Sequence, residues 1–289
     1  MSISPQLGRE HRVGIPAGAI SYRDRGDGSP IVFVHGVGVN GDLWRHVVPR
    51  LAVSHRCITP DLPWGSHSIP LDPAADLSLP GMARITADFL EALDLDNVTI
   101  VANDTGGAVA QALVGRHARR IGRLVLTSCD AFEKFPPTPQ KYLEVMARSR
   151  VLTWIVAYTA QFKPIQRLPT AYGFVTSRAM PPDIMRSFTD PVRLNPGVRR
   201  DFRRMLRAVD TKYTFEAADG LTNFDRPALV LWAENDKIFP RDHGRRLANL
   251  LPQGRFELVS GSRTFIPEDQ PDHLVTAIEE FLGRRSQAT

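Results

Sequence analysis

The stretch VANDTGGAVAQ, residues 101–111, sets one carboxylate, Asp104, between an apolar strand-like run and a helix-like segment. A sharp strand-to-helix turn that presents a side chain needs small residues two positions before and after it, because bulky ones would clash. Ala102 and Gly106 meet this demand, and Gly107 follows. A helix N-terminus favours an anion, so an ionised Asp104 is stable there and has the chemistry of a nucleophile. An aspartate that only caps the helix fits equally well, and the pentad alone leaves both interpretations open.

The segments on either side of this turn alternate between strand-like and helix-like patterns. A hairpin followed by β-α alternation predicts a mostly parallel sheet with helices on both faces. The predicted strands are Arg12–Ile15, Ala19–Asp24, Ile31–His35, Arg56–Pro60, Val98–Asn103, Arg123–Ser128, Ala228–Ala233 and Arg255–Val259. The predicted helices are Leu43–Ala52, Met82–Leu93, Ala108–His117, Arg245–Leu250 and His273–Leu282.

The alternation stops after about residue 134 and returns with the strand-like RPALVLW. Between them the pattern is helical and interrupted by prolines, in FPPTP, MPPD and LNPG. This pattern predicts a helical insertion that covers one end of the sheet. We therefore expect a core domain of residues 1–134 and 224–289 and a helical cap of residues 135–223, inserted after the sixth strand.

The segment GVGVNG, Gly36 to Gly41, matches a dinucleotide-binding fingerprint, and Asp61 ends the next strand about twenty residues on. A hairpin precedes this strand, however, and His35 comes directly before the first glycine. A glycine-rich turn after a strand also leaves backbone N–H groups free to face an anion. Both interpretations stand until the later segments of the chain are considered.

Five segments follow predicted strands in a fixed order along the chain. They are His35-Gly36 after the third strand, PDLPWGSHS after the fourth, ANDTGG at the end of the fifth, LWAENDKIFP after the insertion, and SRTFIPEDQPDHL near the C-terminus. Over essentially its whole length the chain resembles the α/β-hydrolase superfamily, in particular its aspartate-nucleophile branch of haloalkane dehalogenases and epoxide hydrolases. The resemblance implies an α/β-hydrolase fold with a mostly parallel eight-stranded sheet. It leaves little room for the dinucleotide interpretation.

The resemblance implies that Asp104 attacks an electrophilic carbon and that the N–H groups of Val37 and Thr105 form the oxyanion hole. It also implies that Asp236 orients a histidine that activates the water for ester hydrolysis. In this chain Thr264 stands at the position of that histidine. A hydroxyl cannot shuttle protons near neutral pH as imidazole does. We therefore predict a remodelled triad of Asp104, Asp236 and Thr264.

Three further residues differ from the family pattern at positions that bind the substrate. Dehalogenases carry a Trp where this chain has Thr105, and many carry an Asn where it has Val37. Epoxide hydrolases carry a Pro where it has Gly38. A halide site and standard epoxide hydrolysis are therefore not predicted.

Residues with a possible auxiliary or pocket role are His35, Asp130, Trp154, Tyr158, Tyr172 and Arg263. His35 and His67 are candidates to replace the missing imidazole, and Asp130 occupies an alternative acid position of some relatives. Without an imidazole, two facing carboxylates would raise one pKa, which suits a general base. Arg263 could instead neutralise one of them.

The composition of the chain indicates which kinds of partner it is expected to bind. The 289 residues carry a net charge of +5, but no aromatic platform or reader motif accompanies the arginines, so we expect no nucleic-acid binding. The longest apolar run, Val151 to Ala160, is too short to span a bilayer. Cys57 and Cys129 fall in apolar strands and suggest core packing in a reducing, cytoplasmic compartment. No metal site or cofactor is predicted.

Two functions remain open. We favour an enzyme that acts on a small apolar molecule, by hydrolysis or by a lyase, isomerase or cyclase reaction that needs one base. The alternative is a non-catalytic protein that binds a small ligand in the same pocket.

Overall fold

The computed structural model describes residues 2–137 and 142–283. Residue 1 and residues 284–289 of the predicted core domain, and residues 138–141 of the predicted cap, lie outside the described residues.

An eight-stranded sheet forms the centre of the molecule, in the order β1-β2-β4-β3-β5-β6-β7-β8. The strands are β1 (Arg9–Ile15), β2 (Gly18–Arg25), β3 (Pro30–Val34), β4 (Arg56–Pro60), β5 (Val98–Asp104), β6 (Ile121–Cys129), β7 (Ala228–Ala233) and β8 (Gly254–Val259). The β1–β2 and β2–β4 pairs are antiparallel, and all other pairs are parallel. The predicted hairpin and mostly parallel sheet are confirmed.

The α-helices of the described residues include every predicted one except the first. They are α1 (Val48–Leu51), α2 (Leu79–Ala92), α3 (Thr105–His117), α4 (Tyr142–Ala147), α5 (Arg150–Thr159), α6 (Lys163–Gln166), α7 (Pro182–Leu194), α8 (Pro196–Arg207), α9 (Thr211–Leu221), α10 (Arg241–Leu250), α11 (Ile266–Asp269) and α12 (Pro271–Gly283). Short 3₁₀ turns are η1 (Pro5–Leu7), η2 (Gly41–Trp44) and η3 (Ala118–Arg120). The predicted helix Leu43–Ala52 is wrong as one element: it is broken into η2 and α1, with Pro49 in the first turn of α1.

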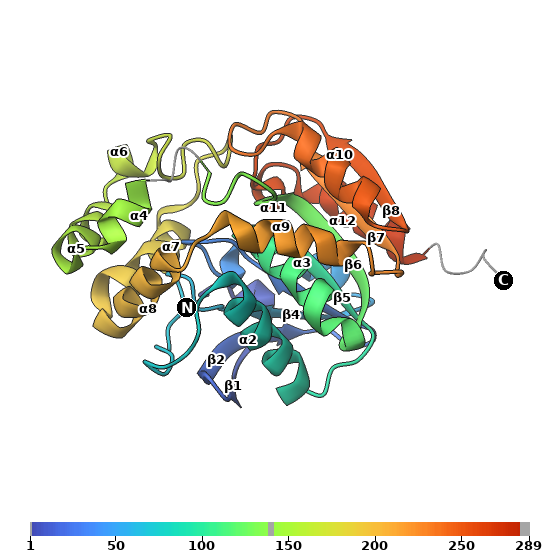
Figure 1. The fold of residues 1–289 in the computed structure, drawn as a ribbon, viewed down its shortest axis with the longest axis horizontal. Helices are drawn as coiled ribbons and strands as arrows, with labels where there is room; N and C mark the ends of the chain where they lie inside the picture. Colours follow the sequence, from blue (N-terminus) through green and yellow to red (C-terminus); the bar gives the residue numbers. More distant parts are fainter. Residues whose placement is uncertain (1, 138–141, 284–289) are drawn as a thin grey trace.

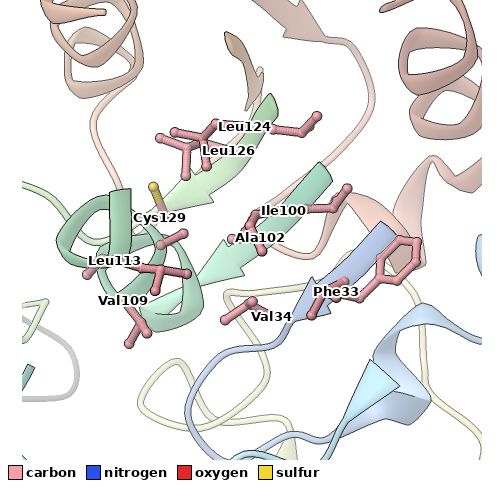
Figure 2. Close-up of a cluster of buried hydrophobic side chains, with 14 of the residues drawn as sticks. Phe33, Val34, Ile100, Ala102, Val109, Leu113, Leu124, Leu126 and Cys129 are labelled. Atoms are coloured by element: carbon pink, nitrogen blue, oxygen red, sulfur yellow. The ribbon is translucent and has the colours of Figure 1, made fainter. Parts of the chain in front are cut away.

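The hydrophobic core lies on both sides of the central strands. Phe33, Ile100 and Leu124 are fully buried on neighbouring strands, and Val109 and Leu113 of α3 pack toward the same strands (Figure 2). These strands are apolar on both faces, as expected of a parallel sheet covered by helices. Cys57 and Cys129 are both buried free thiols, as the sequence predicted.

Helices α2, α3 and α9 lie side by side across one face of the sheet, whereas α4 to α8 gather at one end of the molecule (Figure 1). We call residues 142–207 the α4–α8 segment. The predicted cap extended to residue 223 and so included α9, but α9 packs along α3 in the layer on the sheet. Gly115 and Gly220 allow the two helix backbones to approach closely. No helix of the described residues is both long and apolar enough to cross a membrane.

Candidate active site

Asp104 sits on the turn from β5 into α3. Its backbone has φ 56° and ψ −134°, in the left-handed region that residues other than glycine rarely adopt. Such a conformation costs on the order of 1–3 kcal/mol and is found mainly at functional sites. The Thr105 N–H donates to Asp104 Oδ1 at 2.8 Å, so the first residue of α3 holds one carboxylate oxygen.

Small residues make this turn possible, as the sequence predicted. A Cβ on Gly106 would lie 2.4 Å from the carbonyl oxygens of Val34 and His35. A Cβ on Gly107 would lie 2.2 Å from the Cβ of Cys129. Neither contact is possible, so the close packing of α3 on the strands requires glycine at both positions.

Gly36 faces the carboxylate directly, a role that the sequence analysis missed. A Cβ at this position would lie 2.5 Å from Asp104 Oδ2. The first glycine of GVGVNG therefore makes room for an acidic side chain. Asp61, the would-be ribose ligand, instead accepts hydrogen bonds from the N–H groups of Ser2 and Gly41, at 2.8 and 3.1 Å. Within this segment Gly36 thus packs against Asp104, and Gly41 binds Asp61.

Asp236 follows β7 and contacts the residue at the expected histidine position. Its Oδ1 accepts from the N–H groups of Ile238 and Phe239, both at 2.8 Å, and from the Thr264 hydroxyl at 3.0 Å. Thr264 is fully buried. Asp236 Oδ2 is buried without a hydrogen-bond partner among the described residues, and the Ser128 hydroxyl lowers the pKa of Asp236.

Asp130 brings a third carboxylate to this place, at the end of β6. Its Oδ2 accepts from the Thr105 hydroxyl at 2.8 Å, while its Oδ1 is buried and finds no partner in the described part of the chain. Thr105 therefore touches two carboxylates, one through its N–H and one through its hydroxyl.

Burial raises the pKa values of all three carboxyl groups. Burial is the main cause of the raised pKa of Asp104, to about 7, and the charge of Asp236 adds to it, while the Thr105 N–H acts in the opposite direction. Burial also raises the pKa of Asp130, with a further contribution from Asp104. Burial raises the pKa of Asp236 despite its two backbone donors. Ion pairs of the described residues involve none of the three.

A cavity of about 190 Å³ lies between this site and the α4–α8 segment. Asp104, Thr105 and Asp130 line it on the sheet side, together with Val37 of the predicted oxyanion loop. The rest of the lining is largely apolar and includes Leu143, Val156, Ala157, Val175, Phe188, Val192, Phe202, Met205, Leu206, Ile238 and Phe265. An apolar chamber with a few polar groups at one end is the usual form of a small-molecule site.

Tyr172 lines this cavity, as does Tyr142, another tyrosine of the predicted cap. The Tyr172 hydroxyl donates to the carbonyl oxygen of Gly38 at 2.6 Å, and burial raises its pKa. Trp154 and Tyr158 do not line the cavity; their side chains are exposed and stack on each other, with ring centroids 5.4 Å apart. They lie one turn apart on the outer face of α5, whereas Val156 and Ala157 occupy the inner face.

Hydrogen bonds to backbone groups keep Arg263 and His35 from the roles suggested for them by the sequence. Arg263 donates to the carbonyl oxygens of Gly173 and Thr176, at 2.9 and 3.0 Å, and neutralises none of the three carboxylates. His35 is fully buried: its Nε2 accepts from the Leu62 N–H and its Nδ1–H donates to the Gly36 carbonyl, both at 2.8 Å. This hydrogen-bond pattern assigns the neutral tautomer, and burial lowers the pKa of His35 to about 3.

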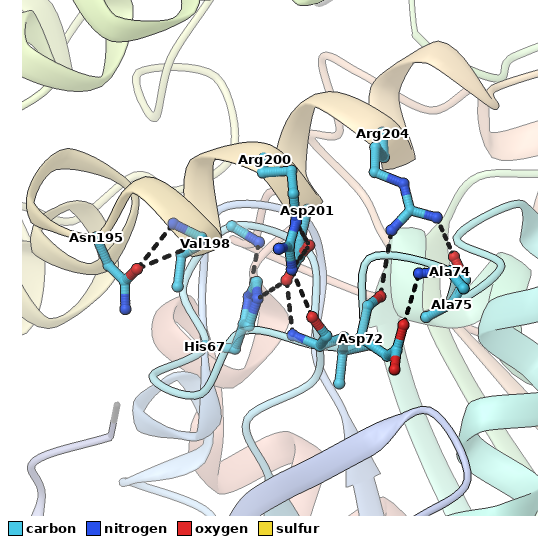
Figure 3. A network of polar contacts seen from close by, with 12 residues as sticks. His67, Asp72, Ala74, Ala75, Asn195, Val198, Arg200, Asp201 and Arg204 are labelled. Atoms are coloured by element: carbon cyan, nitrogen blue, oxygen red, sulfur yellow. Dashed lines mark hydrogen bonds and ion pairs between the residues drawn. The ribbon is translucent and has the colours of Figure 1, made fainter.

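No other described histidine lines the cavity. His67 is held 3.4 Å from Asp201, within the network that fastens α8 to the loop after β4 (Figure 3). His243 and His273 pair with Glu133 and Glu257. The cavity is therefore lined by no imidazole of the residues that the structure describes.

Asn103, directly before Asp104, is a residue that the sequence analysis missed. Its side-chain amide donates to the Thr127 hydroxyl at 2.8 Å and to the Thr264 carbonyl oxygen at 2.7 Å. It thereby joins the Asp104 turn to the loop that carries Thr264. A polar side chain at the end of an otherwise apolar strand was the available signal.

The family model described as alpha/beta hydrolase fold matches residues 29–271, and the chain belongs to this family. It is 29% identical to the cis-3-alkyl-4-alkyloxetan-2-one decarboxylase of Xanthomonas campestris pv. campestris, over 93% of this chain and 94% of that protein. It is 27% identical to the 2-hydroxymuconate semialdehyde hydrolase of Pseudomonas sp., over 99% and 97%. The structure of the haloalkane dehalogenase DatA from Agrobacterium tumefaciens aligns with a TM-score of 0.78 at 20% identity, over 97% and 99% of the two chains.

These comparisons confirm the α/β-hydrolase fold and the predicted neighbourhood of the family. The relatives are enzymes of this fold that carry out different reactions.

Proposed function

We propose that this protein is an enzyme that acts on a small apolar molecule, with Asp104 as its nucleophile or base and with Thr264 in place of the triad histidine. The observation that carries the proposal is the carboxylate of Asp104, which lines an apolar cavity that no described histidine lines. Val37 and Thr105 are its proposed oxyanion hole, and Asp130 and Asp236 act as auxiliary acids.

Attack on carbon needs only an ionised and oriented carboxylate. Because the Thr105 N–H holds Oδ1, Oδ2 is the oxygen left to attack a substrate in the cavity. The resulting alkyl ester must then break down. Hydrolysis would need a general base, which contributes roughly 10²- to 10⁴-fold, and Thr264 cannot supply one. A reaction whose intermediate collapses without water therefore suits this site better than hydrolysis.

Decarboxylation of a strained four-membered lactone is such a reaction, and the Xanthomonas relative is named for it. Asp104 Oδ2 attacks the alkyl carbon C4, and the C4–O bond of the ring breaks, which leaves a carboxylate on C3. The bond from C3 to this carboxylate then breaks and releases CO₂. Its electron pair forms the C3–C4 double bond and expels the Asp104 carboxylate from C4. The products are an alkene and CO₂, and no water, proton or oxidant is consumed.

The test is turnover of cis-dialkyl β-lactones, followed as alkene by gas chromatography, with Asp104→Asn as the inactive control. In oxygen-18 water, the wild-type protein should keep an unlabelled Asp104 after many turnovers, because the ester never meets water. Label in Asp104 would show ester hydrolysis and overturn the decarboxylative route. Binding of lactones, epoxides and haloalkanes without turnover of any of them would favour the non-catalytic ligand binder.

A further inference from the structure

The outer face of α5 exposes an unusual amount of apolar surface. Of the twelve large hydrophobic side chains exposed among the described residues, eight lie between residues 145 and 168. We call six of them the α5 apolar surface: Val151, Leu152, Trp154, Ile155, Tyr158 and Phe162, which are 42–65% exposed. Apolar patches concentrated in this way mark interaction sites more often than scattered ones do.

The spacing of these residues shows one ordered face. Val151, Trp154, Ile155 and Tyr158 follow the three- and four-residue steps of a helix stripe. The rings of Trp154 and Tyr158 stack, and the Tyr158 and Phe162 rings meet edge to face at 6.2 Å. α5 lies at the opposite end of the molecule from β8 (Figure 1).

The charged side chains that neighbour this surface in the sequence are all basic. From Val145 to Pro182 the sequence contains no Asp or Glu. The exposed charged residues of this stretch are Arg148, Arg150, Lys163, Arg167 and Arg178. Next to Trp154 a groove of about 500 Å³ is lined by Arg150, Arg199, Arg200 and Arg203. The partner that complements this surface is therefore apolar at its centre and anionic around it.

We propose that the α5 apolar surface docks this protein on a membrane leaflet that carries anionic phospholipid headgroups. Trp and Tyr prefer the headgroup level, and an amphipathic helix with aromatic and aliphatic residues on one side and arginines beside them binds in the plane of the interface. The arginines contact lipid phosphates, and each contact adds to the affinity. The inner face of α5 lines the active-site cavity through Val156 and Ala157, so docking brings the cavity to within one helix of the lipid.

Trp154 supplies a built-in probe. The sequence has four tryptophans, and Trp44, Trp64 and Trp232 are fully buried. On addition of vesicles of phosphatidylcholine with phosphatidylglycerol, Trp emission should shift to shorter wavelength, and Trp154→Phe should abolish the shift. Vesicles of phosphatidylcholine alone should give a much smaller shift, and added salt should weaken binding because it screens the headgroup charge.

Cosedimentation with the same vesicles gives the matched mutational test. Arg150→Glu changes the local charge by two units and should lower the binding affinity roughly thirtyfold, since each unit charge at a membrane surface is worth about 1 kcal/mol. Arg255→Glu changes the net charge equally at an exposed position of β8 and should bind like the wild type. Ile155→Ser should also weaken binding, whereas Val53→Ser, at an 86% exposed site elsewhere, should not.

Equal effects of the two arginine variants, or equal binding to both vesicle types, would overturn the proposal. So would a dimer, seen by analytical ultracentrifugation, that Ile155→Ser dissociates while the wild type binds no vesicles; a second copy of the chain would then be the partner. Because the docking surface lies outside the cavity, these variants leave the proposed chemistry of Asp104 testable on soluble substrates.

Discussion

Two groups of buried carboxylates can be compared, one that fastens loops and one in the candidate active site. Asp269 belongs to the first group. It accepts hydrogen bonds from the Thr176 hydroxyl, the Ser177 N–H and hydroxyl, and the Arg263 N–H, at 2.8 to 3.1 Å. It thereby ties the chain before α7 to the loop that carries Thr264.

Among the site carboxylates, Asp104 and Asp130 each accept one hydrogen bond, whereas Asp236 accepts three, all at Oδ1. One oxygen of Asp130 and one of Asp236 are buried without a partner among the described residues, and the carboxyl of Asp104 has a pKa of about 7. A buried polar atom without a partner costs roughly 1–3 kcal/mol, so folding alone does not favour this arrangement. Asp269 is saturated with donors, whereas Asp104 and Asp130 line the cavity with one donor each. The following predictions separate the two groups.

Asp104→Asn should have the largest effect on function. Loss of an attacking carboxylate typically lowers turnover on the order of 10⁴-fold or more. Turnover of the lactone or of any other confirmed substrate measures it, and circular dichroism should report an intact fold. Full activity in the Asn variant would reduce Asp104 to a helix cap.

Thr264→His should restore the missing base. After incubation with a reactive alkyl halide or epoxide, intact-mass spectrometry of the wild type should show a persistent ester on Asp104. The histidine variant should release it roughly 10²- to 10⁴-fold faster, because imidazole beside Asp236 can activate water. Thr264→Gln is the matched control, of similar size but without a titratable ring. Release by the glutamine variant as well, or no adduct on the wild type, would contradict a site stalled for want of a base.

Asp269→Ala should chiefly reduce stability. It leaves several buried donors unpaired and should lower the free energy of unfolding by about 2–4 kcal/mol in urea denaturation. Asp272→Ala, three residues along, removes an exposed ion pair with Arg50 and should cost less than about 1 kcal/mol. Similar losses in both variants would mean that Asp269 does not fasten its loop.

Ionisation of Asp104 should make the folded protein less stable as pH rises, the opposite of the usual effect of a carboxylate with a lowered pKa. The folded pKa of Asp104, about 7, exceeds its ordinary value of 3.8, so between these values the folded state binds more protons than the unfolded state. Stability should therefore fall as pH rises from about 4 to about 7. Asp104→Asn should remove this loss, making the variant more stable than the wild type at pH 8 by roughly 2–4 kcal/mol and no different at pH 4.

The matched control for this titration is Asp219→Asn, which changes an exposed carboxylate on α9. Its pH profile should parallel that of the wild type. An Asp104→Asn variant that is less stable than the wild type at pH 8 would show that the carboxylate of Asp104 stabilises the fold.

Much of the fold could be predicted from local patterns in the sequence. The strands Arg56–Pro60 and Ala228–Ala233 coincide with β4 and β7, because short apolar runs between turn residues have few alternative conformations. The sequence could not show that Trp154 and Tyr158 lie outside the cavity. α5 carries apolar residues on its inner and outer faces, so its periodicity does not say which face meets the cavity.

The sequence by itself determined the carboxylate at the strand-to-helix turn, the small residues that the turn needs, and the absence of histidine at position 264. Those constraints act between neighbouring residues, through sterics and helix electrostatics. Only the tertiary structure decided that Thr264 donates to Asp236, 28 residues away, and that Asn103 reaches Thr264, 161 residues away. Such contacts depend on the order in which β5, β6 and β7 pair, and on burial that sets the pKa of Asp104, neither of which is encoded in any local spacing.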